Sequence, residues 1–165
     1  MSTCKSCKKE LGFFSIKRRC CKCYDIICNK CTETVDYEQF GNEILLLNKI
    51  GELDQSLASK WNGNAFFCKT CWYKIKPKFI KLSNSGGVNV KTYTINYQGK
   101  IPKYTRHMCY VSEYYKDRNE AFTEIKRIAE FLGSSCVIEI NLKKDTGQDG
   151  NYIYSIWAVE GKIIF

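Results

Sequence analysis

The segment from Cys4 to Cys31 reads CKSCKKELGFFSIKRRCCKCYDIICNKC, and a fourth Cys-x-x-Cys unit follows at Cys68–Cys71. Two cysteines separated by two residues can bind one metal ion from a single tight turn, called a knuckle, and zinc takes four such ligands. Four knuckles therefore predict two structural Zn²⁺ sites in which every position is filled by sulfur. The eight ligands are Cys4, Cys7, Cys20, Cys23, Cys28, Cys31, Cys68 and Cys71.

The placement of the cysteines also indicates the compartment. Eight of the eleven cysteines are paired before residue 72, whereas Cys109 and Cys136 stand alone. No charged-then-apolar signal peptide precedes Cys4, so we expect a reducing compartment in which paired cysteines bind metal rather than form disulfides. The longest apolar run, Ile44 to Leu47, is far shorter than the roughly 20 residues that cross a bilayer. We expect a cytoplasmic protein, at most peripheral at a membrane.

The net charge of +9 is concentrated in the cysteine-rich half of the chain. Residues 1–82 hold 15 Lys/Arg against 8 Asp/Glu, a net +7, and residues 83–165 hold 11 against 9, a net +2. A basic surface favours partners rich in phosphate, such as anionic lipid or nucleic acid, and it also increases solubility. The charge alone does not choose among these roles.

Between the third and fourth knuckles, apolar side chains recur at intervals of three and four residues: Leu46, Ile50, Leu53, Leu57 and Trp61. This spacing predicts one amphipathic helix that continues across Gly51 and packs on the zinc module, or contacts a membrane or partner. After the fourth knuckle we expect a basic, aromatic-rich tail, and then a linker over residues 83–87, which read SNSGG. The first domain is therefore predicted over residues 1–82.

Residues 88–165 alternate apolar and polar side chains as β-strands do. We expect strands over 88–97 and within 104–115, a helix that begins at Asp117 and Glu120 and stops at Gly133, and a strand over 136–142. We then expect a turn over 145–151, a strand over 152–159 and an edge strand over 163–165. The fold class is α+β: a two-zinc finger with an inserted helix, then a small domain of antiparallel strands, one helix and a C-terminal hairpin.

The residues around the first three knuckles resemble the FYVE zinc-finger family. KKELGFFSIKRR lies between the first two knuckles, and CCKCYDIICNKC contains the second and third. In that family the knuckles alternate between the two zinc ions, an arrangement called a cross-brace. The resemblance implies that Cys4, Cys7, Cys28 and Cys31 bind one zinc, and that Cys20, Cys23, Cys68 and Cys71 bind the other. Cys21 lies where the family usually has a basic residue, and it is left outside the ligand set.

FYVE domains bind phosphatidylinositol 3-phosphate at membranes, through a basic RRHHCR strand and an apolar loop before it. The matching positions imply contact with a membrane or anionic ligand by Phe13, Phe14, Ile16, Lys17, Arg18, Arg19 and Lys22. Arg18 and Arg19 stand where the family has its two histidines, no WxxD element precedes Cys4, and Phe66-Phe67-Cys68 replaces the RVC element. We therefore expect contact with an anionic membrane surface and leave the lipid headgroup open.

Residues 121–161 resemble the C-terminal part of the YbjQ-like family of small bacterial α+β proteins. The shared elements are a helix ending at Leu132-Gly133, an apolar strand, a Thr146-Gly147 turn and a final strand closing on Gly161. Members of that family are thought to form ring-shaped oligomers, so the resemblance implies a homo-oligomer formed through residues 88–165.

Other classes of function remain open on the sequence. Lysines and arginines lie among Phe13, Phe14, Trp72, Tyr73 and Phe79, a mixture that could contact phosphates and stack on the bases of a nucleic acid. A RING domain also crosses two zinc sites, but it normally uses a histidine ligand, and His107 lies far from the knuckles. Because no motif joins a nucleophile to a base, and closed four-cysteine sites leave no position for a zinc-bound water, we expect no enzyme.

The sequence thus predicts a non-enzymatic zinc-binding adaptor that recruits or scaffolds. Its basic finger is expected to contact an anionic membrane surface or another macromolecule, such as a protein partner. Nucleic-acid binding is the first alternative. Protein interaction or oligomerisation without lipid binding is the second.

Overall fold

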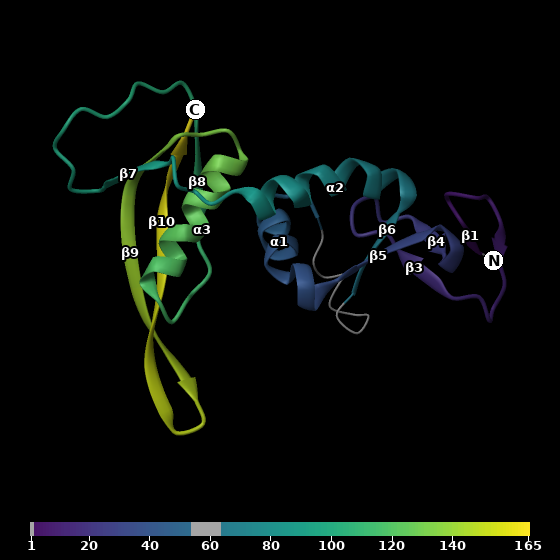
Figure 1. Ribbon diagram of the computed structural model, residues 1–165. Coiled ribbons are helices and arrows are strands. Elements are labelled where there is room, and N and C mark those ends of the chain that lie inside the picture. Colours follow the sequence, from purple (N-terminus) through teal and green to yellow (C-terminus); the bar gives the residue numbers. More distant parts are fainter. Residues whose placement is uncertain (1, 54–63) are drawn as a thin grey trace. The chain divides into compact units, whose positions relative to one another are not determined.

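Residues 2–53 and 64–165 are described from a computed structural model of the chain (Figure 1). The chain divides into two compact units, Met1–Ile80 and Lys81–Phe165. The predicted α+β class is confirmed, since the first unit contains an inserted helix among short strands and the second ends in a β-hairpin. The predicted boundaries, with a linker over residues 83–87, stay a prediction.

Three two-stranded antiparallel sheets form the framework of the first unit. Strand β1 (Ser2–Thr3) pairs with β2 (Glu10–Leu11), β3 (Lys17–Arg19) pairs with β4 (Ile26–Cys28), and β5 (Thr32–Asp36) pairs with β6 (Asn64–Cys68). A short 3-10 helix, η1 (Asn29–Cys31), connects β4 to β5. Each sheet therefore encloses a knuckle or ends at one.

Helix α1 (Tyr37–Lys49) is the predicted insert, but it ends earlier than the sequence suggested. Gly51 has a φ of +76°, the Glu52 N–H donates to the Leu47 carbonyl at 2.8 Å, and the Gly51 N–H donates to the Asn48 carbonyl at 2.9 Å. These two bonds around a left-handed glycine form a Schellman motif, which stops a helix. The prediction of one helix that continues across Gly51 is therefore wrong.

The apolar residues predicted to share one face of that helix do not all lie on α1. Leu46 lies on α1 and is buried, whereas Leu53 is buried after the helix has ended. The N–H of Ile50 still donates to the Leu46 carbonyl, at 3.3 Å. Leu57 and Trp61 lie outside the described residues. The spacing found the helix but placed it too late in the chain.

Helix α2 (Lys69–Asn84) covers the segment that the sequence predicted as a basic tail and the start of the linker. Ile75 and Phe79, four residues apart, are buried on one face, as in other amphipathic helices. Five lysines and Pro77 within the helix obscured this face in the sequence. The tail is therefore an ordered helix that begins between the two cysteines of the fourth knuckle.

An aromatic cluster forms the core of the first unit. The ring centroids of Phe67 and Trp72 are 5.6 Å apart, those of Trp72 and Phe79 are 5.9 Å apart, and those of Phe67 and Phe79 are 6.3 Å apart. Phe40, at a kink in α1, meets Phe79 edge-on at 6.1 Å. Tilted and edge-on rings at these distances attract one another. The cluster joins α1, β6 and α2 next to Cys68.

The second unit is a four-stranded sheet with one helix packed on it (Figure 1). The strands are β7 (Lys91–Thr94), β8 (His107–Val111), β9 (Cys136–Asp149) and β10 (Tyr152–Ile164), in the order β7-β9-β10-β8. Only the β7–β9 pair is parallel. The helix is α3 (Arg118–Phe131), and it buries Ala121, Ile125, Ile128 and Ala129 together with Val137, Val159 and Ile163 of the sheet.

The start of α3 agrees with the sequence. Asp117 is the N-cap residue, and its Oδ1 accepts a hydrogen bond from the Asn119 N–H at 2.8 Å. Farther along the helix, the buried Glu124 carboxylate accepts bonds from the hydroxyls of Tyr110 at 2.5 Å and Tyr115 at 2.6 Å. Burial, together with the charge of Glu124, raises the pKa of both tyrosines, so their hydroxyls stay protonated donors. This network ties β8 and the chain after it to α3.

The C-terminal hairpin is longer than the sequence predicted. Residues 145–149, predicted as part of a turn, continue β9, and the chain reverses only at Gly150, which has a φ of +57°, and Asn151. Residues 163 and 164 belong to β10, beyond an irregularity between Glu160 and Lys162, and do not form a separate edge strand. The turn prediction fails because residues 145–149 of β9 are mostly exposed on both faces, so no apolar alternation marks them. The edge-strand prediction fails because the buried Ile163 and Ile164 continue the pairing of β10 with β8.

Residues 85–87, within the predicted linker, contact α3. The Arg127 guanidinium donates to the Ser85 carbonyl at 3.0 Å, and the Gly87 N–H donates to Glu130 Oε2 at 2.7 Å. Gly87 has a φ of +69°, and a Cβ there would lie 2.5 Å from the Cβ of Lys126 and 2.9 Å from its backbone carbon. The close approach to α3 therefore requires glycine.

Replacing Gly87 tests this contact. Gly87→Ala should lower the free energy of unfolding by roughly 2–4 kcal/mol, because it adds a steric overlap with the α3 backbone to the cost of a left-handed alanine. The control is Gly133→Ala, at a φ of +85° with no atom within 4 Å of the added Cβ, which should cost only about 1 kcal/mol. Urea unfolding followed by circular dichroism measures both, and equal losses would contradict the packing of Gly87 on α3.

Candidate metal centres

The structure brings the eight paired cysteines together as two groups of four. The first cysteine group is Cys4, Cys7, Cys28 and Cys31, and the second cysteine group is Cys20, Cys23, Cys68 and Cys71. Within each group the four Sγ atoms lie within 4.8 Å of one another. Each group joins knuckles that alternate along the chain. The sulfur atoms therefore have the crossed arrangement that the sequence resemblance implied.

The distances between sulfur atoms of different knuckles fit a shared metal ion. Cys7 Sγ lies 3.8 Å from Cys28 Sγ, and Cys23 Sγ lies 3.9 Å from Cys68 Sγ. Four sulfurs placed tetrahedrally at about 2.3 Å from a zinc ion would be about 3.8 Å apart. Both groups therefore have room for one metal ion bound by four sulfurs.

The first two knuckles share one backbone conformation. The Lys8 N–H donates to the Cys4 carbonyl at 2.8 Å, and the Tyr24 N–H donates to the Cys20 carbonyl at 2.9 Å. Lys8 and Tyr24 have φ values of +62° and +63°, in the left-handed region. The residue after each knuckle thus turns the chain back so that both sulfurs point to one place. Because neither position is glycine, the sequence did not reveal this conformation.

The third and fourth knuckles use the ends of regular elements. Cys28 ends β4, Cys31 lies in η1, and the Cys28 N–H donates to Cys4 Sγ at 3.3 Å. Cys68 ends β6, and its Sγ accepts from the Cys71 N–H at 3.4 Å in the first turn of α2. That sulfur takes the role of an N-cap, where a helix favours negative charge.

Backbone hydrogen bonds favour one thiolate in each cysteine group. Burial alone would raise the pKa of the Cys4 thiol, but hydrogen bonds from the backbone of Cys7, Cys28 and Ser6 outweigh it and lower this pKa to about 6. In the second group, burial is likewise outweighed by backbone hydrogen bonds, and the pKa of Cys20 is lowered. The Cys4 thiol therefore favours the thiolate at neutral pH, and the backbone around Cys20 shifts that thiol in the same direction.

Three other thiols in these groups have a raised pKa, and a cation would favour the loss of their protons. Hydrogen bonding with Cys28, with a smaller effect of burial, raises the pKa of Cys31 to about 12. Burial is the main cause that raises the pKa of Cys71 to about 12, and burial also raises the pKa of Cys23. Four thiolates repel one another at these distances unless a cation lies among them. The donor set of each group therefore fits a thiolate-binding metal ion.

The other three cysteines lie outside both groups. Cys21 and Cys136 are buried and Cys109 is exposed, and no disulfide joins any of the eleven cysteines. The Cys21 N–H donates to the Phe66 carbonyl at 2.8 Å, which ties the second knuckle to β6. Leaving Cys21 out of the ligand set agrees with this geometry.

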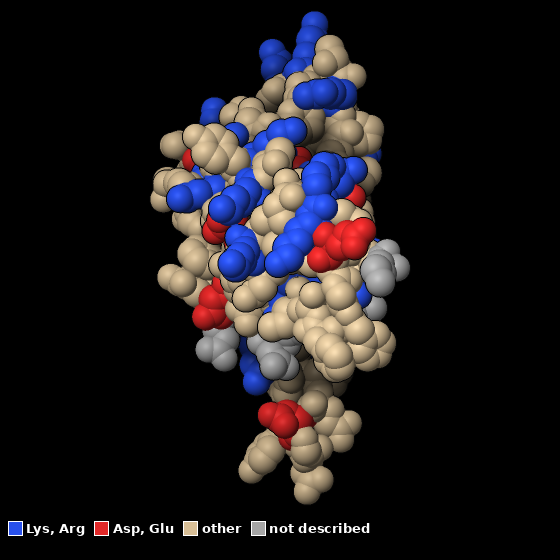
Figure 2. All heavy atoms as spheres, turned by 90° about the vertical axis from the view of Figure 1, so that its right-hand side faces the viewer, with Lys and Arg blue, Asp and Glu red and all other residues tan. Residues whose placement is uncertain are grey.

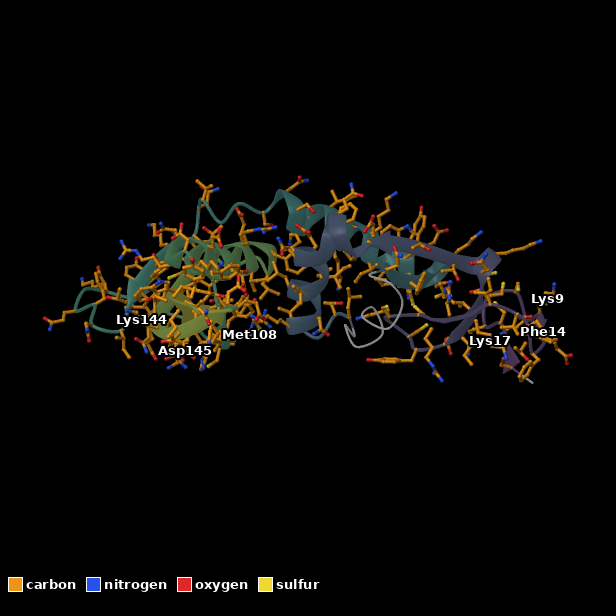
Figure 3. The ribbon with its side chains drawn as sticks, turned by 90° about the horizontal axis from the view of Figure 1, so that it is seen from below. Lys9, Phe14, Lys17, Met108, Lys144 and Asp145 are labelled. Carbon is orange, nitrogen blue, oxygen red and sulfur yellow. The ribbon has the colours of Figure 1, made fainter. Side chains whose placement is uncertain are left out.

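The predicted apolar loop is exposed. Phe13 and Phe14 are 94% and 97% exposed, and they occupy the corner of a turn in which the Ser15 N–H donates to the Gly12 carbonyl at 3.2 Å. Their rings meet edge-on with centroids 5.6 Å apart. Figure 3 shows Phe14 at the same end of the first unit as Lys9 and Lys17. These rings therefore do not cover the core of the first unit.

Two predicted basic residues have partners within the first unit. The Arg18 guanidinium lies over the Phe66 ring at 4.6 Å from its centroid, and Arg19 donates to the Tyr24 carbonyl at 3.3 Å. Lys17, between the turn and these arginines, is half-buried. Exposed lysines of the first knuckle lie near the turn in sequence and were not among the predicted contacts: Lys5, Lys8 and Lys9.

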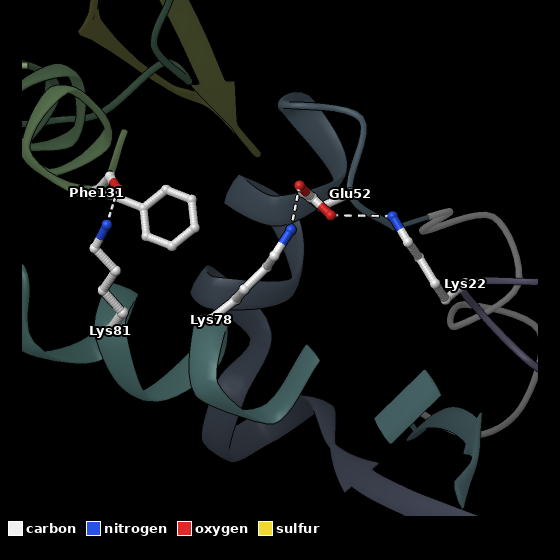
Figure 4. A network of polar contacts seen from close by, with 5 residues as sticks. All are labelled: Lys22, Glu52, Lys78, Lys81 and Phe131. Atoms are coloured by element: carbon white, nitrogen blue, oxygen red, sulfur yellow. Dashed lines mark hydrogen bonds and ion pairs between the residues drawn. The ribbon is translucent and has the colours of Figure 1, made fainter. Parts of the chain in front are cut away.

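Lys22 belongs to a polar network. Its ammonium contacts Glu52 at 3.0 Å, and Glu52 also accepts a hydrogen bond from Lys78 (Figure 4). The hydrogen bond from Lys78 lowers the pKa of the Glu52 carboxyl. The single Glu52 carboxylate therefore balances one of the two positive charges of Lys22 and Lys78.

A further lysine of Figure 4 lies in the second unit. The Lys81 ammonium donates a hydrogen bond to the Phe131 carbonyl at 2.5 Å.

No family model, curated protein or solved structure matches this chain. The resemblances to the FYVE and YbjQ-like families stay predictions that depend on the quoted residues. Within residues 2–53 and 64–165, none of the helices is both long and apolar enough to span a membrane.

The crossed pairing predicts which double substitutions act on the same metal site. Cys7→Ser and Cys28→Ser should each remove one metal ion per chain in the presence of a competing chelator, and the double variant should also lose one. Cys7→Ser combined with Cys68→Ser should lose both ions, because these sulfurs belong to different groups. Elemental analysis measures the content, and Cys109→Ser is the control. Loss of both ions from the Cys7/Cys28 double variant would contradict the crossed pairing.

Proposed function

We propose that this protein is a non-enzymatic, FYVE-like double-zinc module that docks on an anionic membrane surface. The observation that carries the proposal is the pair of almost fully exposed rings, Phe13 and Phe14, on a turn next to exposed lysines. Large apolar side chains exposed side by side on a soluble surface usually mark an interaction site. The proposal places a cytoplasmic protein at the membrane periphery and assigns it a recruiting or adaptor role.

Zinc is the proposed metal in both cysteine groups. Sulfur-only donor sets with tetrahedral spacing are typical of structural zinc, and zinc has no redox chemistry to disturb the thiolates. All four positions would be filled by protein sulfur, which leaves none for a substrate or an activated water. The ions would therefore stabilise the fold, in agreement with a non-enzymatic module.

The free energy available at the loop suits reversible membrane contact. Complete burial of a phenylalanine side chain contributes about 1.5–3 kcal/mol, and a lysine near an anionic surface adds about 1 kcal/mol. Figure 2, which faces the end of Figure 1 where β1 to β4 are labelled, shows more Lys and Arg than Asp and Glu side chains. Two rings and several lysines would together bind membranes of high negative charge and release them at high salt.

Nucleic-acid binding is the second candidate, and one face of α2 favours it. Tyr73 is 86% exposed, and exposed lysines surround it: Lys69, Lys74 and Lys76. A flat ring among lysines could stack on a base while the ammonium groups contact phosphates. Two other aromatic residues in the predicted stacking set cannot contribute, because Phe79 is buried and Trp72 packs between Phe67 and Phe79.

The membrane proposal predicts a specific effect of the two rings. The intact protein should float with liposomes that contain phosphatidylserine, and Phe13→Ser/Phe14→Ser should reduce the bound fraction at least tenfold, because it removes the apolar insertion. Tyr73→Ser, which removes an exposed ring from α2, is the matched control and should bind as the unaltered protein does. Flotation is repeated with phosphatidylinositol 3-phosphate to test the headgroup.

Three outcomes separate the candidates. Absence of binding to any anionic liposome would contradict the membrane proposal. If Tyr73→Ser reduced the liposome-bound fraction as much as the double variant, the result would place the membrane contact on α2 as well as on the turn and would contradict the proposed site. A salt-dependent shift of oligonucleotides that Tyr73→Ser abolishes would support nucleic-acid binding instead.

A further inference from the structure

The distal half of the β9–β10 hairpin is a ribbon of only two strands. Strand β7 pairs with β9 as far as Thr94↔Ile140, and β8 pairs with β10 only from Val111↔Glu160 toward the C-terminus. Residues 143–149 of β9 pair with residues 152–158 of β10. Figure 1 shows this part of the hairpin extending beyond the end of α3. We refer to residues 143–158 as the ribbon.

The outer edge of β9 in the ribbon is open. Among the residues that the structure describes, no strand pairs with this edge beyond Ile140, whereas the β10 edge is partly occupied by a bridge between Tyr115 and Trp157. An isolated two-stranded hairpin is only marginally stable in water, and an open edge presents unpaired N–H and C=O groups. At the tip, Tyr152 and Ile153 are 81% and 73% exposed. Both features favour an added strand.

The charges along this edge are complementary to themselves. Lys143 and Asp149 each lie three residues from Thr146, in the sequence KKDTGQD. If two β9 edges pair antiparallel about a two-fold axis at Thr146, Lys143 lies opposite the partner's Asp149, and the same pair forms again across the axis. Both residues point to the same face of the sheet, because they are six positions apart. Opposite charges would therefore meet twice.

The neighbouring registers are less favourable. An axis moved to Asp145 would place this residue opposite the partner's Asp145, and an axis at Gly147 would place it opposite the partner's Asp149. Like charges directly opposite each other destabilise a strand pair. With the axis at Thr146, Asp145 faces glycine and Lys144 faces glutamine, so no like charges meet. The charge pattern therefore selects one register.

The structure leaves both members of the pair accessible. Asp149 is exposed and has no ion-pair partner in the part of the chain that is described. Lys143 contacts Glu160 of its own hairpin at 2.5 Å, and its side chain is still 44% exposed. In the selected register, the partner's hairpin tip also arrives near the end of β7, where Ile95 is exposed. The tip would then cover apolar surface on the other copy.

We propose that the outer edge of β9 in the ribbon pairs with the same edge of a second copy of this chain, centred on Thr146. The result is a two-fold dimer in which the sheets of both copies are joined, with a self-complementary interface as this symmetry requires. The inference does not depend on the membrane contact proposed for the first unit. It assigns a specific surface to the self-association that was expected for residues 88–165.

Charge reversal with complementation tests the pairing. Sedimentation velocity on the full chain at low salt should show a monomer–dimer equilibrium, with a dissociation constant of roughly 10–100 μM, because one strand pair buries little area. Lys143→Asp and Asp149→Lys should each weaken the dimer about tenfold or more, because like charges then meet twice. An equimolar mixture of the two variants should dimerise again, because opposite charges face each other in the mixed pair. A folding defect cannot produce that recovery.

Lys100→Asp, an exposed charge reversal outside the ribbon, is the matched control and should associate as the unaltered protein does. An unaltered chain that stays monomeric at millimolar concentration would overturn the proposal. Variants that dimerise normally would place self-association elsewhere, and a mixture that stays monomeric would also reject the pairing. Liposome binding at saturating lipid is measured on the same variants, so a failure of this inference is distinguishable from a failure of the membrane proposal.

Discussion

The first unit depends on one electrostatic constraint: eight thiols gathered into two groups cannot all become thiolates without a cation in each group. The strands around them are two to five residues long, and such small sheets bury little surface. Metal binding would therefore supply much of the folding free energy. Because the groups alternate along the chain, one group joins Cys4 to Cys31 and the other joins Cys20 to Cys71. Neither can close without ordering segments that belong to the other.

The residues that stabilise the first unit are different from those that it exposes at the turn. The aromatic cluster of Phe67, Trp72 and Phe79 and the sulfur groups account for the interior, so the turn at Phe13 and Phe14 need not contribute to it. The turn lies between knuckles of different groups, which would hold it rigidly while its rings face outward. A preorganised apolar turn binds a surface with little loss of conformational entropy. That combination is the physical basis of the proposed membrane contact.

The sequence predicted features whose signal is local. The cysteine spacing identified all eight grouped residues, and Asp117 marked the start of α3 correctly. Sequence-based prediction failed where other residues masked the apolar spacing. Gly51 stops α1 through a left-handed cap. The lysines of α2, together with Pro77, obscured the buried face of that helix. Residues 145–149 at the end of β9 were mistaken for a turn because the side chains on both of their faces are polar or absent. The left-handed backbone at Lys8 and Tyr24 had no glycine to mark it. The crossed grouping came from a family resemblance, since spacing alone does not choose partners.

The most direct test of the account is X-ray absorption at the zinc edge on the purified 165-residue chain. Two closed sulfur sites predict a single shell of four sulfur atoms at about 2.3 Å from zinc, without nitrogen or oxygen neighbours, at two zinc ions per chain. A shell with fewer than four sulfurs, a nitrogen or oxygen ligand, or iron in place of zinc would contradict it.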